Sequence, residues 1–463
     1  MIGASAAGTT IEWYDFYLYG VLASFFATQF FPPGNEVAAL LSSLAAFGAG
    51  FAVRPFGAAF FGRIGDIVGR KFTFLVTITL MGLSTAAVGL LPTYSQIGIL
   101  APILLVFLRL LQGLALGGEY GGAAIYVAEH SPDHKRGFYT SWIQTTATVG
   151  LLMALTVILI FRVSMGDQQF REFGWRIPFL FSAVLVAMAL YVRLRLRETP
   201  LFTRLKDAGQ SSTSPWRESF GNAPNRRLIL LALFGMTAGQ AVVWYQGQFQ
   251  ALFFLQNTLN IPFQDSYLIT GVAIALATPF FLFFGRLSDT IGRKPIILGG
   301  CLLAAITYIP IYILMTNFAG PGTPGTNAAG AAITLHTTPN HLALIALIFI
   351  QVLYVTMVYG PIAAFLVEYF PARIRYTSLS IPYHIGNGWF GGFLPLIFTA
   401  LAVAFANPLA GLAYPIIVAL MTAFIGWRFV RETKDVRIWD EVGGEQEQKV
   451  PAGAINADSI AGA

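Results

Sequence analysis

GRIGDIVGRK (Gly62–Lys71) returns as GRLSDTIGRK (Gly285–Lys294) later in the same chain. Six of the ten positions are identical, and they hold Gly, Arg, Asp, Gly, Arg and Lys. A charged repeat is unexpected here, because only 11% of the residues are Asp, Glu, Lys or Arg. The repeat indicates two related structural units, and the other motifs can be placed relative to it.

The composition predicts a membrane protein. Hydrophobic residues make up 56% of the chain and the mean hydropathy is +0.66, whereas soluble domains carry about 25% charged residues. Inside a bilayer the backbone must be helical or closed into a barrel. Unbroken apolar runs such as FTFLVTITLMGLSTAAVGLL match the ~20 residues of a spanning helix, while barrel strands would alternate. We therefore expect an all-α membrane protein.

Apolar runs separated by charged breaks predict twelve transmembrane helices in two pseudo-symmetric six-helix halves. The expected spans are 3–31, 36–61, 72–91, 97–128, 138–162, 174–194, 227–256, 265–285, 295–316, 340–368, 376–402 and 409–430. The expected units are an N-terminal half at 1–194, a cytoplasmic linker at 195–225, a C-terminal half at 226–434 and a disordered cytoplasmic tail at 435–463. The single cysteine, Cys301, excludes an intramolecular disulfide.

The repeat extends beyond its first motif. AEHSPDHKRG (Ala128–Gly137) and VEYFPARIRYT (Val367–Thr377) align Glu129 with Glu368 and Arg136 with Arg375, and RET at Arg197–Thr199 recurs at Arg431–Thr433. Each motif pair follows the same even number of predicted crossings within its half. The two halves are therefore expected to be parallel repeats, related by an axis along the membrane normal.

The positions of the 28 Lys and Arg residues predict the orientation. Most of them fall in alternate connections, on the side that holds both copies of the first motif, and the other side holds only Arg162, Arg171 and Arg176. By the positive-inside rule both termini face the cytoplasm. No basic, aromatic-interleaved soluble segment suggests nucleic acid as a partner, and nothing before Thr10 resembles a signal peptide.

These motifs together resemble the major facilitator superfamily. The resemblance rests on the twice-repeated G-R-x-x-D-x-x-G-R-K, on RLLQGLALGG from Arg109 and on the two RET ends. EWYDFYLYG (Glu12–Gly20), RPFGAAFFGRIGD (Arg54–Asp66) and GGEYGGAAIYVAE (Gly117–Glu129) further resemble its metabolite:proton symporter branch. That branch includes permeases for 2-oxoglutarate, shikimate, citrate and proline or betaine.

The resemblance implies that the charged motifs gate the inner mouth between the halves. Glycines permit a tight turn, and Asp66 is placed to accept backbone N–H bonds from a helix N-terminus. Arg63 and Arg70 are expected to pair with Glu129 or Glu198, and the second half holds equivalents. The alternative is that Asp66 and Asp289 only cap the helices that follow them, while the arginines anchor to lipid phosphates. The candidate gating residues are Gly62, Arg63, Asp66, Arg70, Glu129, Arg136, Glu198, Gly285, Arg286, Asp289, Arg293, Glu368, Arg375 and Glu432.

Ionisable residues inside the predicted spans are costly and usually line a cavity. The resemblance implies that Asp15 and Arg109 form the proton-coupling pair, and Glu12 and Glu119 are further candidates for proton coupling. The alternatives are a static salt bridge between Asp15 and Arg109, and a place for Glu12 at the inner interface. The glycines around Glu119, including Gly113 and Gly117, are expected to serve close helix packing.

Polar side chains in several spans predict a cavity for a small polar ligand. Arg54 precedes Pro55, so it attracts an anion or, alternatively, binds carbonyls freed by the proline. His384 is a proton shuttle or, equally, a histidine satisfied by a carbonyl. The candidate substrate-binding residues are Arg54, Gln144, Gln240, Trp244, Tyr245, Gln248, Tyr383, His384 and Asn387.

We therefore expect a secondary active transporter, not an enzyme, in the bacterial cytoplasmic membrane. It should move a small carboxylate-bearing metabolite, an organic acid or a zwitterion, by proton-coupled alternating access, with import by symport. The alternatives are a proton antiporter and, from another class, a membrane-embedded transferase, which is disfavoured because no nucleotide loop, metal spacing or nucleophile elbow is found. The expected partners are the substrate, protons and the lipid bilayer, with no cofactor, no metal and a monomeric chain.

Overall fold

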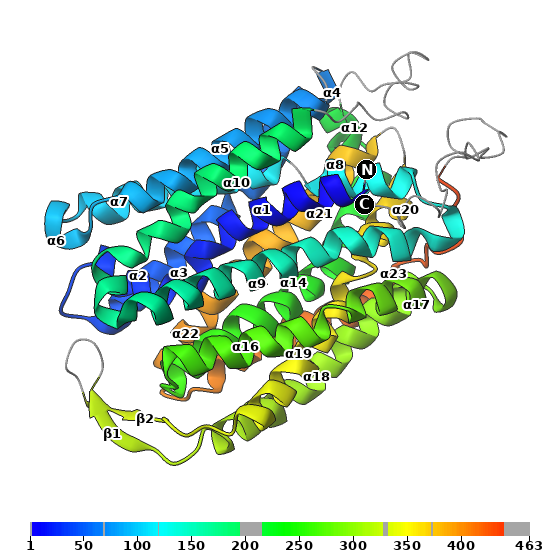
Figure 1. Cartoon of the computed structure of the whole chain (residues 1–463). Helices are drawn as coiled ribbons and strands as arrows, with labels where there is room; N and C mark the ends of the chain where they lie inside the picture. Colours follow the sequence, from blue (N-terminus) through cyan, green and yellow to red (C-terminus); the bar gives the residue numbers. More distant parts are fainter. Residues whose placement is uncertain are drawn as a thin grey trace, which may run out of the picture.

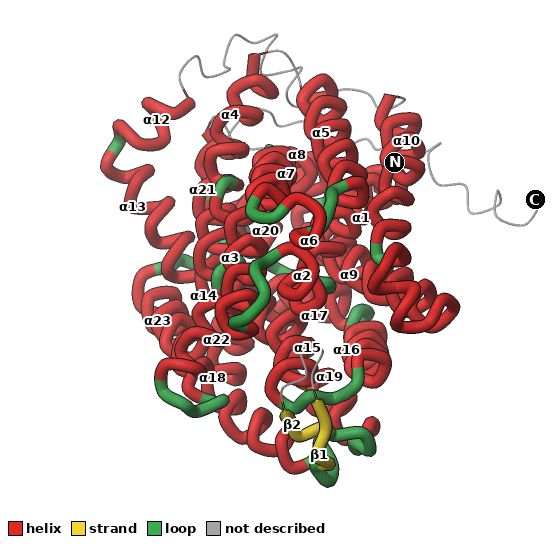
Figure 2. The backbone as a smooth tube through the Cα atoms, turned by 90° about the vertical axis from the view of Figure 1, so that its left-hand side faces the viewer, coloured by secondary structure: helices red, strands yellow, loops and turns green. Residues whose placement is uncertain are grey.

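The computed structural model describes residues 2–67, 70–118, 120–194, 215–326, 332–371 and 374–438. It is a bundle of long helices that run side by side, with one short hairpin (Figure 1). Helix α6 and the hairpin lie toward one end of the bundle, which we call the hairpin end and which faces the reader in Figure 2. We call the opposite end, where Gly137, Asp289 and Glu368 lie, the motif end.

The first half, residues 2–194, contains ten α-helices and two short turns of other helix types in its described part. They are α1 (Ile2–Val21), α2 (Ala23–Phe30), α3 (Glu36–Ala52), α4 (Arg54–Ile67), α5 (Arg70–Leu90), α6 (Tyr94–Ile97), α7 (Leu100–Gly117), α8 (Tyr120–Glu129), η1 (Asp133–Lys135), α9 (Arg136–Gln169), η2 (Phe170–Gly174) and α10 (Arg176–Leu194).

The second half, described over 215–326, 332–371 and 374–438, is helical in these residues apart from loops and one antiparallel strand pair, in which Thr323 pairs with Leu335. Its first elements are α12 (Pro215–Gly221), α13 (Ala223–Ala232), η3 (Leu233–Thr237), α14 (Ala238–Tyr245), η4 (Gln246–Gln250), α15 (Ala251–Phe253), η5 (Phe254–Thr258), α16 (Phe263–Ala277), α17 (Phe280–Ile291) and α18 (Arg293–Asn317). The hairpin of β1 (Thr323–Thr326) and β2 (Ala332–Leu335) and the last helices follow: α19 (His341–Tyr359), α20 (Ile362–Tyr369), α21 (Arg375–Ile385), η7 (Gly386–Gly391), α22 (Leu394–Ala404), η8 (Ala410–Leu412) and α23 (Ala413–Phe429).

Nine helical runs in the described part of the chain are long and apolar enough to cross a membrane. Two shorter apolar helices cover Leu75–Leu90 and Arg176–Tyr191, and α1 with α2 occupies the first predicted span. A multi-pass helical membrane protein is therefore confirmed, while the count of twelve spans stays a prediction. Several predicted spans are interrupted near proline or glycine, as at Val53 and at Gly360, because these residues cannot continue a regular helix without cost.

Corresponding helices pack in the same pairs in both halves. In the first half α1 packs on α9, α5 on α10, and α3 and α4 on α7. In the second half α14 packs on η7, α18 on α23, and α16 and α17 on α19. The halves meet mainly where α9 crosses α17 and where α4 crosses α21. This arrangement is the one expected from a repeat with parallel copies.

Glycines set the closest helix crossings. A Cβ at Gly113 would lie 1.7 Å from the carbonyl oxygen of Gly50, and a Cβ at Gly117 would lie 2.2 Å from that of Arg54. The predicted packing role of these two glycines is confirmed. Gly285, the first residue of the second motif, meets Gly137 of the other half, where an added Cβ would lie 2.5 Å from the Gly285 carbonyl oxygen. The motif glycine thus allows α9 and α17 to touch.

The predicted linker and tail are partly described. Helix α12 lies inside the segment expected to be a linker, 195–225. At the start of the tail, Ile438 is buried and the carbonyl of Val436 accepts a hydrogen bond of 3.1 Å from Arg136. The remaining residues of both segments lie outside the described part of the chain.

Candidate functional site

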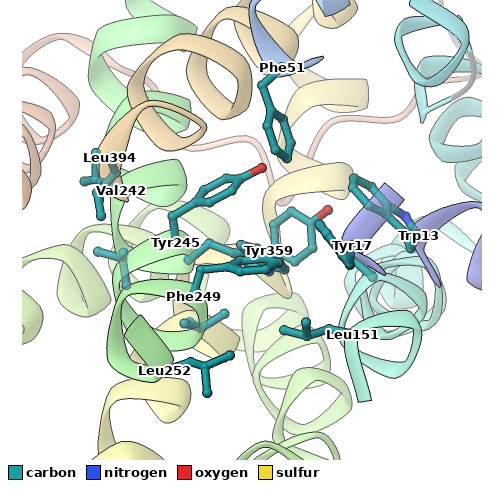
Figure 3. Close-up of a cluster of buried hydrophobic side chains, with 14 of the residues drawn as sticks. Trp13, Tyr17, Phe51, Leu151, Val242, Tyr245, Phe249, Leu252, Tyr359 and Leu394 are labelled. Atoms are coloured by element: carbon teal, nitrogen blue, oxygen red, sulfur yellow. The ribbon is translucent and has the colours of Figure 1, made fainter. Parts of the chain in front are cut away.

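Aromatic side chains from both halves meet in the middle of the bundle (Figure 3). Trp13 stacks on Tyr17 with ring centroids 5.0 Å apart, and Tyr17 stacks on Trp244 of the other half at 5.5 Å. Tyr120 and Tyr383 stack almost parallel across the same interface at 3.5 Å. We call this group the central aromatic cluster; it consists of Trp13, Tyr17, Phe51, Tyr120, Trp244, Tyr245, Phe249, Tyr359 and Tyr383.

Arg54 lies against this cluster, at the start of α4, where the helix resumes after the break at Val53. Its guanidinium carbon is 5.4 Å from the ring centroids of Trp13 and Phe51 and 5.9 Å from that of Tyr383. The side chain is fully buried, and its three nitrogens make no hydrogen bond within 3.5 Å to any described residue. The alternative that Arg54 binds carbonyls freed by Pro55 is therefore wrong for this structure.

His384, on α21, is also fully buried. Neither ring nitrogen has a hydrogen-bond partner among the described residues, so the alternative of a histidine satisfied by a carbonyl is not observed. Its ring meets those of Tyr120 and Tyr383 edge-on, with centroids 6.5 and 5.3 Å away. A cation and an imidazole that no described residue hydrogen-bonds thus border the same aromatic cluster.

Gln144 links the two halves beside this cluster. Its amide donates 2.9 Å to the hydroxyl of Tyr120 and 3.0 Å to the backbone carbonyl of Tyr359. The Tyr359 hydroxyl in turn lies 2.7 Å from that of Tyr383. Tyr120 and Tyr359 were not predicted as site residues, because an isolated tyrosine in a span carries no signal of what it faces.

The remaining predicted polar residues divide into two groups. Gln240 and Asn387 exchange two amide hydrogen bonds of 3.1 Å, so they satisfy each other. Gln248 is buried with no hydrogen-bond partner among the described residues, and the same holds for the indole N–H of Trp244. Tyr245 packs edge-on against Phe51 of the first half, with ring centroids 5.2 Å apart. Among these predicted residues, Gln248 and Trp244 have polar groups that no described residue hydrogen-bonds.

Arg109 is held by the first half itself. One guanidinium nitrogen donates 3.2 Å to the carbonyl of Phe16 and 2.6 Å to the side chain of Gln112. Its guanidinium carbon lies 4.3 Å from the ring centroid of Phe16 and 4.7 Å from that of Tyr19. Arg109 therefore differs from Arg54, whose guanidinium makes no hydrogen bond to a described residue.

Asp15 is fully buried but does not pair with Arg109. Neither carboxylate oxygen has a hydrogen bond within 3.5 Å to a described residue, and the neighbouring polar group is the hydroxyl of Ser182 on α10. The alternative of a static salt bridge is thus wrong for this structure. Glu12 is buried as well, whereas Glu119 lies outside the described residues.

Glu368 is the centre of an ionic cluster at the motif end. Its carboxylate accepts a hydrogen bond of 2.7 Å from Arg136 of the other half and bonds of 3.2 and 3.0 Å from Arg293. The hydroxyl of Thr433, in the second RET motif, adds a bond of 2.7 Å. Arg136 also contacts Asp133. Because Glu368, Arg136 and Arg293 are buried, the charges depend on one another for compensation.

Asp289 bridges the halves in a way that the sequence did not predict. Its carboxylate accepts backbone N–H bonds of 2.8 Å from Gly137 and 2.9 Å from Phe138, at the N-terminus of α9. It also binds Arg293 at 2.7 Å. The alternative that Asp289 caps the helix after it is wrong, since that helix is α18. An anion at a helix N-terminus is favoured by the free N–H groups and the helix dipole, and here the helix belongs to the other half.

Glu432 caps α18 instead. Its carboxylate accepts the backbone N–H groups of Arg293 at 2.9 Å and Lys294 at 3.0 Å. Arg286 is exposed and forms no ion pair with a described residue, so its place in the ionic cluster is not observed. Glu129 and Arg375 are buried at the same end. Glu198, the surroundings of Gly62 and the side chains of Arg63, Asp66 and Arg70 lie outside what the structure describes.

The halves also touch at the hairpin end, through weaker contacts. The hydroxyl of Tyr267 donates 2.7 Å to the carbonyl of Val21, and Asn257 donates 3.0 Å to Ser24. The guanidinium of Arg162 lies 3.5 Å from the ring centroid of Phe263. The described residues thus close both ends of the bundle and bury the centre between them.

Comparison with known proteins identifies this architecture. The family model described as MFS/sugar transport protein matches residues 122–374, and the model described as sugar (and other) transporter matches residues 1–228. The chain belongs to the major facilitator superfamily. The families and the relatives that match are transporters and not enzymes, so this chain is a transporter.

Several bacterial permeases resemble the transporter over most of their length. It is 36% identical to the alpha-ketoglutarate permease of Escherichia coli, over 85% of this chain and 84% of that protein. It is 32% identical to the shikimate transporter of the same organism, over 87% of both chains. It is 31% identical to the proline/betaine transporter of Escherichia coli, over 92% of this chain and 82% of that protein.

The fold of the transporter resembles solved structures as well. The crystal structure of a D-xylose-proton symporter superposes with a TM-score of 0.69 over 94% of this chain and 98% of that chain. The sequences are only 20% identical, so this likeness concerns the fold alone.

Sequence reasoning predicted Trp244, Tyr245 and Tyr383 as site residues but missed the other aromatic residues of the transporter's centre. Trp13 and Tyr17 lie one helical turn apart and share a face of α1, but their spacing equally suits an apolar lipid-facing stripe. Phe51, Tyr120 and Tyr359 carry no pattern of their own. Only the crossing of distant helices shows that the rings of Trp13, Phe51 and Tyr383 lie against Arg54.

Proposed function

We propose that this transporter imports a small metabolite that bears a carboxylate, an organic acid or a zwitterion, by proton symport. The observation that carries the proposal is Arg54, a buried guanidinium without a hydrogen bond to any described residue. A buried charge without a partner is costly, so a site that keeps one is suited to an anionic ligand. Guanidinium binds carboxylate with two parallel hydrogen bonds, which makes this group the natural complement.

The surroundings of Arg54 support a small ligand with polar groups. The rings of Trp13, Phe51 and Tyr383 would exclude water and strengthen the ionic contact. The free hydrogen-bonding groups of His384 and Gln248 suit carbonyl, hydroxyl or second carboxylate oxygens. The relatives support the same class, because 2-oxoglutarate, shikimate, proline and betaine all carry a carboxylate.

Proton coupling is assigned to Asp15 and Arg109 in this proposal. Asp15 is buried without a cationic partner among the described residues, so proton uptake would remove an uncompensated charge. Arg109 already has a carbonyl and an amide as partners and can remain charged through the cycle. A membrane potential supplies ~2.3 kcal/mol per charge and 100 mV, which corresponds to about fortyfold accumulation of substrate.

In this proposal, access alternates because the two ends of the bundle open in turn and are closed by different contacts. At the motif end, the ionic cluster of Arg136, Asp289 and Glu368 would open for release and close for loading. At the hairpin end, contacts such as Tyr267 with Val21 would open for loading. We place the motif end and both termini in the cytoplasm, because most Lys and Arg residues lie there.

The test is uptake into proteoliposomes of labelled carboxylates and zwitterions, with and without an inward proton gradient. Wild-type protein should accumulate at least one compound only with the gradient. Asp15→Asn should abolish this accumulation but retain exchange of labelled for unlabelled substrate, whereas Arg54→Gln should strongly reduce both at low substrate concentration. Uptake that the gradient opposes would indicate antiport, and transport only of uncharged compounds would refute the carboxylate assignment.

A further inference from the structure

A groove runs along the outside of the bundle, between α18 and α23 at the motif end. Its volume is about 570 Å³, and the small residues Gly299 and Ala423 lie in its lining. The lining is mostly apolar and exposed, since Trp427 is 69% exposed and Phe424 is 62% exposed. The lining residues are Ile291, Lys294, Pro295, Leu298, Gly299, Leu302, Ala423, Phe424, Trp427 and Glu432.

The end of the groove beside the start of α18 carries positive charge. Lys294 donates 2.8 Å to the carbonyl of Trp427 and 2.9 Å to that of Val430, and its ammonium group has a third N–H left for another acceptor. Lys434 donates 3.1 Å to the carbonyl of Thr290, next to the lining residue Ile291, and keeps two N–H groups.

The acidic residue in the lining does not cancel this charge. The Glu432 carboxylate accepts backbone N–H bonds from Arg293, Lys294, Thr433 and Lys434, so its charge is compensated by the start of α18 and by its own chain. Two lysines whose ammonium groups keep N–H groups that no described residue accepts therefore stand at the mouth of an apolar groove.

We propose that this groove binds one anionic phospholipid of the adjacent leaflet, with its phosphate at Lys294 and Lys434. One acyl chain would lie along Leu298, Leu302 and Phe424. The groove lies on the membrane-facing side of α18 and α23, where a lipid is the available apolar occupant. Basic groups at the polar end of such a groove favour an anionic over a zwitterionic headgroup. No element of the proposed transport mechanism is needed for this inference.

Trp427 offers a direct test, because bromine atoms on an acyl chain in the groove would quench its fluorescence. The transporter is reconstituted in phosphatidylcholine vesicles that contain a small fraction of brominated phosphatidylglycerol or, in parallel, brominated phosphatidylcholine. The chain has 8 tryptophans, so the Trp427 signal is the difference between wild type and Trp427→Phe. We expect stronger quenching of Trp427 by the anionic lipid at equal mole fraction.

Two variants assign the preference to the groove. Each lysine should contribute about fivefold, so Lys294→Gln with Lys434→Gln should remove most of the preference. Gly299→Leu keeps both charges but fills the groove, and it has room because an added Cβ meets only Met357 at 3.7 Å; it should reduce quenching by both lipids. Trp389, 45% exposed elsewhere, is the control tryptophan and should show no preference. Equal quenching of Trp427 by the two lipids, or a preference unchanged in the lysine variant, would overturn the proposal.

Discussion

Glu368 of the second half accepts a hydrogen bond of 2.7 Å from Arg136 of the first half, and both side chains are buried. The same carboxylate binds Arg293, whose guanidinium also reaches Asp289. One acidic residue thus connects the two halves and the second copy of the repeated motif. The first predictions concern this connection.

Glu368→Gln should open the motif end. The substitution removes the charge that compensates Arg136 and Arg293, and breaking one partner of a buried pair costs about 3 to 5 kcal/mol. We expect a cysteine placed at buried Thr140, one turn after Arg136, to react with a soluble thiol reagent at least about tenfold faster. The background carries Cys301→Ala. Arg286→Gln is the matched control, since Arg286 belongs to the same motif but forms no ion pair with a described residue. An unchanged labelling rate in Glu368→Gln would exclude this gate.

Asp289 should hold the N-terminus of α9 through its charge and through both of its carboxylate oxygens. Asp289→Ala loses the bonds to the N–H groups of Gly137 and Phe138, whereas Asp289→Asn keeps one acceptor but loses the charge. A helix-capping side chain contributes about 1 kcal/mol, so the Thr140 cysteine should react severalfold faster in Asp289→Ala. Asp289→Asn should lie between Asp289→Ala and wild type. Equal rates in all three proteins would show that the carboxylate does not hold α9.

Gly285→Ala should weaken the same end for a steric reason. An added Cβ would lie 2.5 Å from the hydroxyl oxygen of Ser141 and 2.7 Å from the carbonyl oxygen of Gly137. Helices α9 and α17 would have to separate, so we expect faster labelling at Thr140 and a lower Tm. Gly271→Ala is the control, because nothing lies within 4 Å of a Cβ there. A Gly285→Ala protein that behaves as Gly271→Ala does would contradict the close crossing.

Arg54→Gln should lower substrate affinity and raise stability at the same time. Arg54 makes no hydrogen bond to a described residue, so removing its buried guanidinium relieves an uncompensated charge and Tm should rise. Loss of the charge-assisted hydrogen bonds should weaken binding by about ten- to a hundredfold. Arg109→Gln should do the opposite to stability, since it leaves Phe16 and Gln112 without their donor. Thermal unfolding and equilibrium binding in detergent separate the two effects, and a lower Tm in Arg54→Gln would contradict the assignment.

Tyr267→Phe should favour opening at the hairpin end. It deletes only the hydroxyl that donates to Val21, a contact worth about 1 kcal/mol. We expect a cysteine at buried Thr270, on the same helix, to become severalfold more reactive, while labelling at Thr140 slows or stays unchanged. Faster labelling at both positions would indicate general loosening instead of a shift between two states.

Local patterns were enough to predict much of this protein. Apolar runs of spanning length predicted a helical membrane protein, and the repeat predicted which helices correspond. The glycines near Arg109 were correctly assigned to packing, because four-residue spacing puts them on one helix face. The motif that holds Asp289 was recognised as well, but the helix to which its carboxylate binds was not.

The sequence by itself determined that the chain lies in a membrane, that it is helical and that it contains two related halves. Hydropathy and residue spacing are properties of one or two helices, so they can be read without knowing which helices are in contact. Only the tertiary structure decided that Asp289 binds the N-terminus of α9, that Asp15 and Arg109 remain apart, and that aromatic rings of both halves surround Arg54. These contacts join helices that are far apart in the chain. Their partners are fixed by where the helices cross. The spacing of glycines predicts that a helix packs closely, but it does not show which helix it meets.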